Sequence, residues 1–393
     1  MFNRSKWTSP AALLLIIMIA TLFFQFGIGL QRTIYNNFIS EELAIEAQGL
    51  GIIESIREIP GLLTIVLIAA LGLFTEPVAM AVCISLLSVG LVLYGMAGGL
   101  AGLIVATTVY SVGFHLYMPV QSSMVLRLAK PGEKGRRLGE LESVRALAGF
   151  LAMGFVILTA RFLNYRMLFW WAAGLSLIGA VIMLIMPRDK SQITARKMIF
   201  RKSYWLYYVL IFLSGSRMHI YQIFATFFLV SVFEIPVQHM AILLGVSNVF
   251  AMVTRPIIGR FIDKAGEQAA LTINYSFVIL IFLGYAFVRY LPFIYFLYVL
   301  DNASMGVSMA ISTFLDKIAP REEVISSLAM GSTIQHIAGV MVPVVGGTIW
   351  STYGYQYTFM TGAFFAVISL IACRFINQER KLKEIVVVQT SES

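Results

Sequence analysis

Twelve long apolar runs constrain this chain more than any other feature of its sequence. A hydrocarbon core about 30 Å thick needs roughly 20 apolar residues in a helix. At about 33 residues per span and loop, 393 residues hold about twelve spans. The runs are continuous and do not alternate, which argues against a β-barrel. We predict spans at 10–36, 48–74, 78–97, 101–128, 138–161, 167–187, 203–232, 237–261, 269–289, 292–316, 324–350 and 356–376.

The composition also indicates a protein that crosses a membrane several times. Only 12% of the residues are charged and 59% are hydrophobic, whereas soluble domains carry roughly 25% charged residues. The first apolar run is too long for a signal peptide and is followed by no small-residue cleavage site, so we expect it to remain as the first span. Cys83 and Cys373 lie in apolar runs and predict neither a disulfide nor a metal site. We expect no cofactor.

Basic residues predict the orientation of the spans. With the N-terminus in the cytoplasm, 21 of the 29 Lys and Arg residues fall in cytoplasmic segments, and three fall on the opposite side. Short loops rich in Lys and Arg remain on the cytoplasmic side, so we expect a multi-pass protein of the cell inner membrane with both termini cytoplasmic. This asymmetry accounts for the net charge of +9 without a nucleic-acid partner.

The chain divides into two similar halves. The polar stretch 188–203 is the longest connector, and it predicts a bundle at 1–187, a cytoplasmic linker at 188–202, a bundle at 203–376 and a cytoplasmic tail at 377–393. Residues 142–149, ESVRALAG, match residues 332–339, STIQHIAG, at an offset of 190. Parallel repeats of six helices are a known plan of transporters, which bind their substrate near the membrane midplane where the repeats meet.

The stretch GRFIDKAGEQ at 259–268 resembles the loop motif of the major facilitator superfamily through Gly259, Asp263, Lys264 and Gly266. Glu267 and Gln268 replace its two basic residues, and a weaker copy keeps Gly72 and Glu76. The resemblance implies an all-α membrane fold of twelve transmembrane helices in two pseudo-symmetric six-helix bundles. It also implies a gating role for the four matching residues, as a latch on the cytoplasmic side. The alternative is a well-capped turn with no switching role.

Charges within the stretch GIIESIREIPGLL, residues 51–63, need a protected location. Glu54, Arg57 and Glu58 are three and four residues apart, so they share one helix face, and charges at membrane depth usually face a bundle interior. In one interpretation Arg57 is clamped between the glutamates and Arg32 completes a structural four-charge cluster. In the other, Glu54 or Glu58 exchanges protons between transport states.

Further polar residues fall near the middle of other spans. The repeat places His115 opposite Asp301 and Asn302, and a histidine near a carboxylate can relay protons. The guanidinium group of Arg217, in the predicted span 203–232, can bind a carboxylate or phosphate through two hydrogen bonds. We predict proton coupling at Glu54, Glu58 and Asp301. We predict substrate binding at Arg32, His115, Arg217, His219, Gln222, Asn302, Gln335 and His336.

These features predict a secondary active transporter that moves a small polar or anionic organic solute by alternating access. No nucleotide-binding loop is present, so we take protons as the coupling ion, with sodium as an alternative. No motif of a membrane enzyme is present either, and we expect no enzymatic activity. Spans 4 and 5 lack the family's drug-antiporter elements. The other hypotheses are an exporter of amphipathic compounds or drugs and a transport-inactive receptor or assembly factor. The expected partners are the solute, the ion and the lipid bilayer, and we expect a monomer.

Overall fold

The computed structural model describes residues 9–130, 132–187 and 198–379. Every regular element in this part of the chain is a helix, so the all-α prediction is confirmed there. Residues 188–197 of the predicted linker and 380–393 of the predicted tail lie outside the described residues.

The chain forms two compact units. The first unit comprises residues 1–45, 56–195 and 235–242, and the second comprises 46–55, 196–234 and 243–393. The predicted halves differ from these units by two short segments, which begin helices α2 (Ala47–Leu62) and α10 (Val237–Ala265). Each of these two helices therefore contributes to both units.

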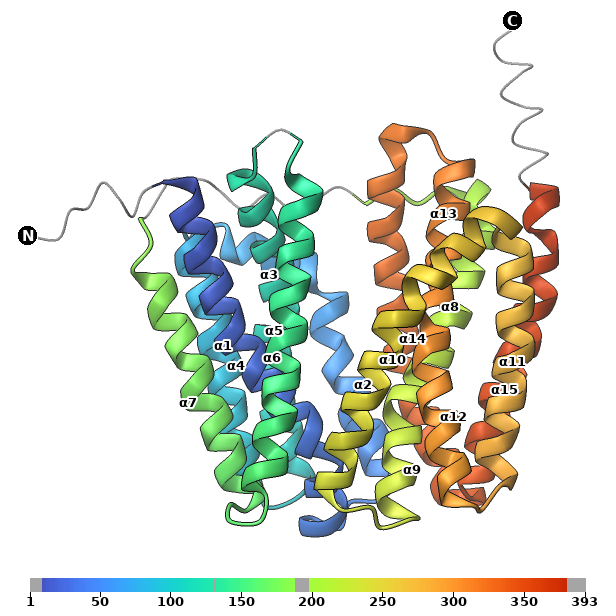
Figure 1. Ribbon diagram of the computed structural model, residues 1–393, viewed down its shortest axis with the longest axis horizontal. Helices are drawn as coiled ribbons and strands as arrows, with labels where there is room; N and C mark the ends of the chain where they lie inside the picture. The colour runs from blue at the N-terminus through green and yellow to red at the C-terminus, as the bar shows by residue number, and fades with distance from the viewer. Residues whose placement is uncertain (1–8, 131, 188–197, 380–393) are drawn as a thin grey trace, which may run out of the picture. The chain divides into compact units, whose positions relative to one another are not determined.

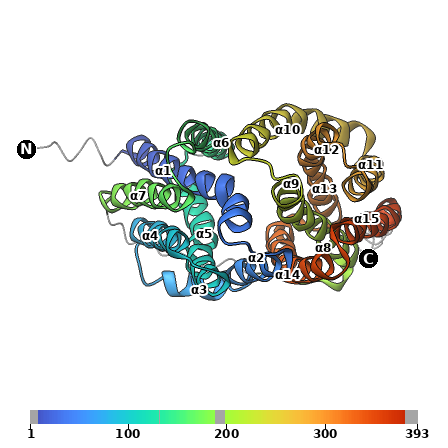
Figure 2. The same ribbon diagram turned by 90° about the horizontal axis from the view of Figure 1, so that it is seen from below.

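The first unit is built around helix α1, which packs between α6 and α7 (Figure 2). Helix α4 packs between α5 and α7. The contact of α4 with α5 is close at Gly90, where a Cβ atom would lie 2.5 Å from the backbone nitrogen of Tyr110. Besides the part of α2 that belongs to it, this unit consists of α1 (Pro10–Asn37) with its π-helical end η2 (Phe38–Glu42), α3 (Thr64–Leu71), α4 (Glu76–Met96), α5 (Leu100–Leu128), α6 (Lys134–Thr159) and α7 (Tyr165–Leu184).

In the second unit, α8 packs against α14 and α15, and α11 packs against α15 (Figure 1). Its core includes Tyr207, Leu271 and Phe314, each at most 1% exposed. The elements of this unit are η3 (Lys202–Tyr204), α8 (Trp205–His219), η4 (Ile220–Ala225), α9 (Thr226–Ser231), α11 (Glu267–Phe287), α12 (Leu291–Ser304), η5 (Met305–Ser308), α13 (Met309–Ile318), α14 (Arg321–Tyr353), α15 (Tyr355–Ala372) and η6 (Cys373–Phe375).

Ten helices of the described chain are long and apolar enough to cross a membrane. The two predicted spans outside this set, 48–74 and 203–232, are those that carry Glu54, Arg57, Glu58, Arg217 and His219. The first is divided between α2 and α3, which are both shorter than 18 residues, and the second carries Arg217 and His219 near its middle. Both spans outside the set therefore carry candidate site residues.

The interruption of the second predicted span has a local cause. Pro60 and Gly61 are poor helix formers, and α2 ends at Leu62 just after them. Helix α3 starts at Thr64, whose hydroxyl donates hydrogen bonds to the carbonyls of Pro60 and Gly61 at 3.1 and 2.8 Å. The continuous helix predicted at 48–74 is therefore corrected to two helices, α2 and α3.

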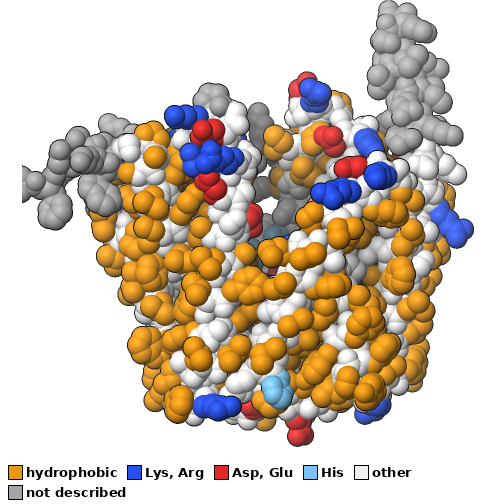
Figure 3. Space-filling model, in the orientation of Figure 1, with side chains coloured by type: hydrophobic (Ala, Val, Ile, Leu, Met, Phe, Trp, Pro, Cys, Tyr) orange, Lys and Arg blue, Asp and Glu red, His pale blue; other side chains and the backbone are white. Residues whose placement is uncertain are grey.

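Hydrophobic side chains cover the flanks of both units, as Figure 3 shows in orange. Exposed Lys and Arg gather at one end of each unit. In the first unit Arg127, Lys130, Lys134 and Arg136 lie around the turn between α5 and α6, and in the second Arg260, Lys264, Lys317 and Arg321 lie around the turns from α10 to α11 and from α13 to α14. An apolar belt with charged ends is the surface expected of helices that lie in a bilayer.

The internal repeat reappears in the backbone. Among the described residues, Ala44 (φ 49°) and Glu234 (φ 53°) are the non-glycine residues with positive φ, and they are 190 positions apart. Each lies one or two residues before the chain passes from one unit into the other. Glu76 and Glu267 likewise occupy the first positions of α4 and α11, and both are buried.

We predict that glycine at position 44 stabilises the protein. The left-handed conformation costs an alanine roughly 1–2 kcal/mol, and glycine adopts it freely at an entropic cost of about 0.5–1 kcal/mol. Ala44→Gly is therefore expected to raise the free energy of unfolding by about 0.5 kcal/mol, measured by thermal unfolding in detergent. Ala44→Val, which adds a β-branched side chain at the same exposed position, should lower it, and equal melting temperatures would contradict the prediction.

Candidate functional site

The first half of α2 packs closely on α14 within the second unit. A Cβ atom at Gly51 would collide with the carbonyl oxygen of Pro343, and the hydroxyl of Ser55 accepts a 3.1 Å hydrogen bond from the backbone nitrogen of Val344. Glu54 lies between these contact points and is 6% exposed. Glu54 therefore faces the interior of the helix bundle, as we expect for a charge at membrane depth.

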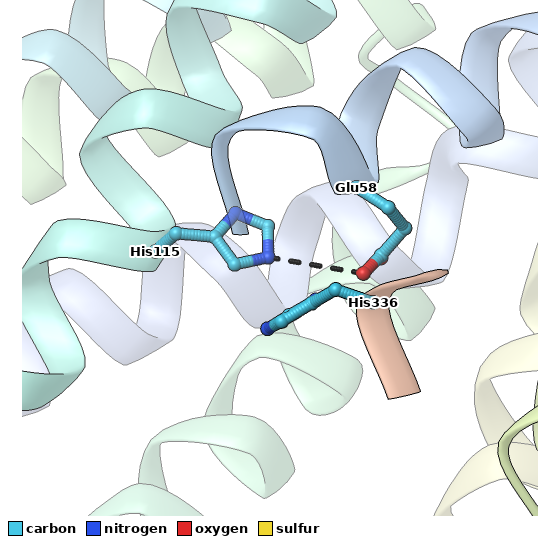
Figure 4. A group of neighbouring side chains, drawn as sticks. All are labelled: Glu58, His115 and His336. Atoms are coloured by element: carbon cyan, nitrogen blue, oxygen red, sulfur yellow. Dashed lines mark ion pairs between the residues drawn. The ribbon is translucent and has the colours of Figure 1, made fainter. Parts of the chain in front are cut away.

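Glu58 and His115 form the centre of a polar cluster in the first unit. Glu58 is 6% exposed, and its carboxylate lies 3.2 Å from the Arg57 guanidinium and 3.9 Å from His115 Nε2 (Figure 4). His115 Nδ1 lies 2.9 Å from Ser111 Oγ, which donates a hydrogen bond to the Arg57 carbonyl. Helices α2 and α5 thus hold a carboxylate and an imidazole face to face. His336, also drawn in Figure 4, belongs to the second unit.

Arg32 does not complete the four-charge cluster that one interpretation of the sequence requires. Its side chain is exposed and makes no hydrogen bond or ion pair with another residue that the structure describes. Arg57 instead pairs with Glu58 of its own helix. The structure therefore corrects this part of the structural interpretation and leaves Glu58 with one arginine and one histidine in its unit.

A second network in the first unit joins α1, α5 and α6. Gln121 Nε2 donates to Tyr117 Oη at 2.8 Å and to Thr21 Oγ1, and these two hydroxyls lie 3.0 Å apart. The Gln121 carbonyl accepts from the Arg145 guanidinium, which also donates to Glu142 at 2.6 Å. Thr21, Tyr117 and Gln121 are fully buried.

The second unit contains a deeply buried ion pair. Arg217 donates to the Asp301 carboxylate at 2.7 Å, and the two side chains are 4% and 0% exposed. Arg217 also donates to Ser304 Oγ, which in turn donates to the Asp301 carbonyl at 2.6 Å. Within the described chain, Arg217 Nε and Asp301 Oδ2 have no hydrogen-bond partner. Arg217 Nε can thus donate one further hydrogen bond, and Asp301 Oδ2 can accept one.

Both helices that hold this pair change their winding beside it. The π-helix η4 begins at Ile220, directly after His219, and the 3₁₀ helix η5 begins at Met305, directly after Ser304. Short π-helical and 3₁₀ segments within longer helices often mark functional or hinge positions. In α8 the change of winding follows Ser214, Gly215 and Ser216, residue types that can loosen a helix.

The remaining predicted residues are dispersed within the second unit. His219 is 3% exposed, whereas Gln222 is exposed. Asn302 donates to Ser247 Oγ at 2.9 Å, so it joins α12 to α10. Gln335 lies on α14 against Gly215, and His336 is half-buried. Asp301 and Arg217 are thus brought together, and Gln222 is directed elsewhere.

The gating motif is arranged differently from the prediction. Gly259 and Asp263 lie inside α10, a Cβ atom at Gly259 would meet nothing within 4 Å, and Asp263 and Lys264 are exposed. Neither charged side chain pairs with another residue that the structure describes. Gly266, with φ +83°, is the N-cap of α11. Asp263 lies in the last turn of α10, four residues before α11 begins, and Gly259, one turn earlier, makes no close helix contact.

The carboxylate at the start of α11 is Glu267, which pairs with Lys317 of α13 at 2.5 Å. In the first unit, Glu76 at the start of α4 pairs with Arg127 at 2.7 Å. A carboxylate at a helix N-terminus is stabilised by the helix dipole. The weaker copy of the loop motif would align Glu76 with Asp263, whereas the structure aligns Glu76 with Glu267, 191 residues further along. This offset is close to the 190 that separates residues 142–149 from 332–339.

Comparison with known proteins identifies related families and folds. A model of the Major Facilitator Superfamily matches residues 17–324. One curated relative, the multi-drug resistance efflux pump PmrA homolog of Lactococcus lactis subsp. lactis (strain IL1403), is 27% identical over 137 residues. That match covers 34% of this chain and 33% of the relative, so the chain spans about one third of the relative's length.

Solved structures share the fold at low sequence identity. The nucleoside transporter NupG aligns with a TM-score of 0.79 and 18% identity over 93% of this chain and 98% of its own. A bacterial homolog of the human lysosomal transporter Spinster, inward-facing and unoccupied, gives 0.73 and 14% over 94% and 98%. A mutant of the peptide transporter POT gives 0.72 and 16% over 94% and 95%.

Proposed function

The chain belongs to the major facilitator superfamily, and on that basis we propose that it is a proton-coupled secondary transporter of a small polar organic solute. The observation that carries the proposal is a buried carboxylate beside a basic side chain in each unit. Glu58 faces His115 in the first unit, and Asp301 faces Arg217 in the second. Ionisable groups within a membrane usually belong to ion or substrate pathways.

Each of these pairs can respond to a proton. Protonation of a carboxylate removes its charge and weakens its attraction to the neighbouring base, so the pair can exist in two states. A transporter couples ion and solute when each favours the same conformational state. We propose that the proton does so at Glu58 or Asp301, and that alternating access carries the solute across. Glu54, buried on α2, is the third candidate.

The balance of buried charges bears on the solute. The structure gives Arg217 a fully buried carboxylate partner, so the fork proposed from sequence to bind a carboxylate or phosphate is already occupied. Arg57 is likewise paired with Glu58. Arg217 and Arg57 are therefore neutralised without a solute, and we propose His219 and Gln335 among the hydrogen-bonding contacts of the solute.

Reconstitution into proteoliposomes tests the proposal. We expect counterflow of at least one member of a panel of nucleosides, dipeptides and sugars, and uphill accumulation when an inward proton gradient is imposed. An imposed sodium gradient serves as the ion control. Absence of counterflow for the whole panel, from protein that unfolds cooperatively, would favour the transport-inactive receptor hypothesis.

A second candidate is export of amphipathic compounds, which the partial match to an efflux pump homolog favours. Export predicts that cationic dyes loaded into proteoliposomes leave faster when the proton gradient is directed into the vesicles. Protons that enter would then drive the dye out. The polar-solute proposal predicts no effect of the protein on dye efflux. The same vesicles therefore separate the two candidates.

A further inference from the structure

Arginines that lie in the helices of this protein differ in how completely their carboxylate partners are buried. The Asp301 side chain, which pairs with Arg217, is 0% exposed, and that of Glu58, which pairs with Arg57, is 8% exposed. Glu142, which pairs with Arg145, is 67% exposed. An exposed ion pair contributes little free energy, because water screens the charges and competes for the carboxylate. Arg145 therefore has the most easily replaced partner of the three.

The guanidinium of Arg145 is nevertheless held in a fixed place. Gln121 is fully buried and uses its amide nitrogen to donate to Thr21 and Tyr117, so its carbonyl oxygen must face Arg145. Arginine is a donor only, which makes this arrangement of the amide self-consistent. Three neutral, buried side chains from α1 and α5 thus position one cation on α6.

Arg145 can be reached through its terminal nitrogens. Its side chain is 14% exposed, so it is accessible but not solvated on all sides. Its Nε is buried, and of the terminal nitrogens Nη1 donates to the exposed Glu142. Guanidinium groups bind carboxylates and phosphates through two parallel hydrogen bonds. A cation that neutral groups hold in place, and whose counter-ion is exposed, has the properties of a site for an oxyanion.

We infer that Arg145 binds an oxyanion group of the transported solute, a carboxylate or a phosphate, and that Glu142 is displaced when it binds. The inference rests on the proposed function and narrows its solute to one with an anionic group. Gln121, Tyr117 and Thr21 are positioning residues for Arg145. Arg217 and Arg57 keep their buried partners throughout binding.

Matched pairs of probes test this inference on the purified full-length protein in detergent. The pairs are uridine 5′-monophosphate with uridine, dialanine with its C-terminal amide, and benzoate with benzyl alcohol. Binding is measured from the rise in melting temperature with probe concentration. We expect the anionic member of at least one pair to bind more tightly than its neutral partner. A wild type that is stabilised by neutral members alone, or by no anionic member, overturns the inference.

Three variants then separate binding from structure. Arg145→Ala should weaken the anionic probe by roughly 10- to 100-fold, the range for a hydrogen bond to a charged group. Glu142→Gln removes the competing carboxylate and should tighten binding several-fold, whereas a purely structural Arg145–Glu142 pair predicts no gain. Arg161→Ala, at an exposed arginine outside the network, should bind as the wild type does. Unchanged affinity in Arg145→Ala, or unchanged or weaker binding in Glu142→Gln, overturns the inference.

Two further readouts complete the design. If Arg145→Ala does not fold, Arg145→Lys retains the charge without the fork, and it should keep the preference for the anion at reduced affinity. Counterflow of neutral solutes is measured in parallel on the wild type. Counterflow of a neutral solute without anion binding overturns the role of Arg145 and leaves the proposed function standing, whereas absence of all counterflow counts against the function itself.

Discussion

Asparagine in place of Asp301 is expected to lower the free energy of unfolding by about 3–5 kcal/mol, because it leaves Arg217 charged and buried without a counter-ion. Both side chains are at most 4% exposed, so water cannot take the place of the lost carboxylate. Thermal unfolding of the purified variant in detergent measures the effect. Asp316→Asn is the matched control, because Asp316 is an exposed aspartate on the adjacent α13.

Removing both charges should be much less harmful than removing one. Replacing a buried ion pair by apolar residues of similar volume is often neutral or stabilising, so Arg217→Met combined with Asp301→Leu is expected to unfold near the wild-type temperature. The double variant should nevertheless lose proton-driven accumulation if the pair takes part in coupling. Asp301→Asn that melts as the wild type does would contradict the assignment of a buried, charged pair.

The general fold could be predicted from the sequence because it depends on length and hydropathy. A run of 20 apolar residues has few alternatives to a helix in lipid, where every backbone polar group must be hydrogen-bonded. The repeat was visible in residues 142–149 and 332–339. The break after Pro60 was missed, because hydropathy averaged over a span does not register the local cost of Pro60 and Gly61.

The candidate site was less accessible to prediction. Polar residue types at depth identified Glu58, His115, Arg217 and Asp301, but their pairing depends on how helices rotate against one another, which one sequence does not determine. The repeat suggested His115 with Asp301, whereas the structure pairs each with a partner in its own unit. Gln121 gave no signal, because glutamine side chains are mostly exposed and a single one does not indicate a buried network. Its role required Thr21 and Tyr117 to be in place.

Glutamine in place of Glu58 is expected to abolish proton-driven accumulation while preserving solute exchange. Glutamine keeps the size and hydrogen-bonding oxygen of the side chain but can neither bind nor release a proton, so the solute should still cross down its own gradient. In proteoliposomes with an inward proton gradient, we expect accumulation to fall at least about 10-fold, toward the equilibrium level, with counterflow within about twofold of the wild type. Glu46→Gln, at an exposed glutamate just before α2, is the matched control.

The pH dependence of uptake adds an independent measure of the same residue. A carboxylate that carries the coupling proton is loaded more fully as the external pH falls, so wild-type uptake should rise from pH 8 to pH 5. The Glu58→Gln variant should lose this rise. His115 faces Glu58 and can also bind a proton, so His115→Gln is needed to assign any dependence that persists. If Glu58→Gln accumulates solute as the wild type does, the coupling proton resides elsewhere, and the buried Asp301 of the second unit becomes the group to test.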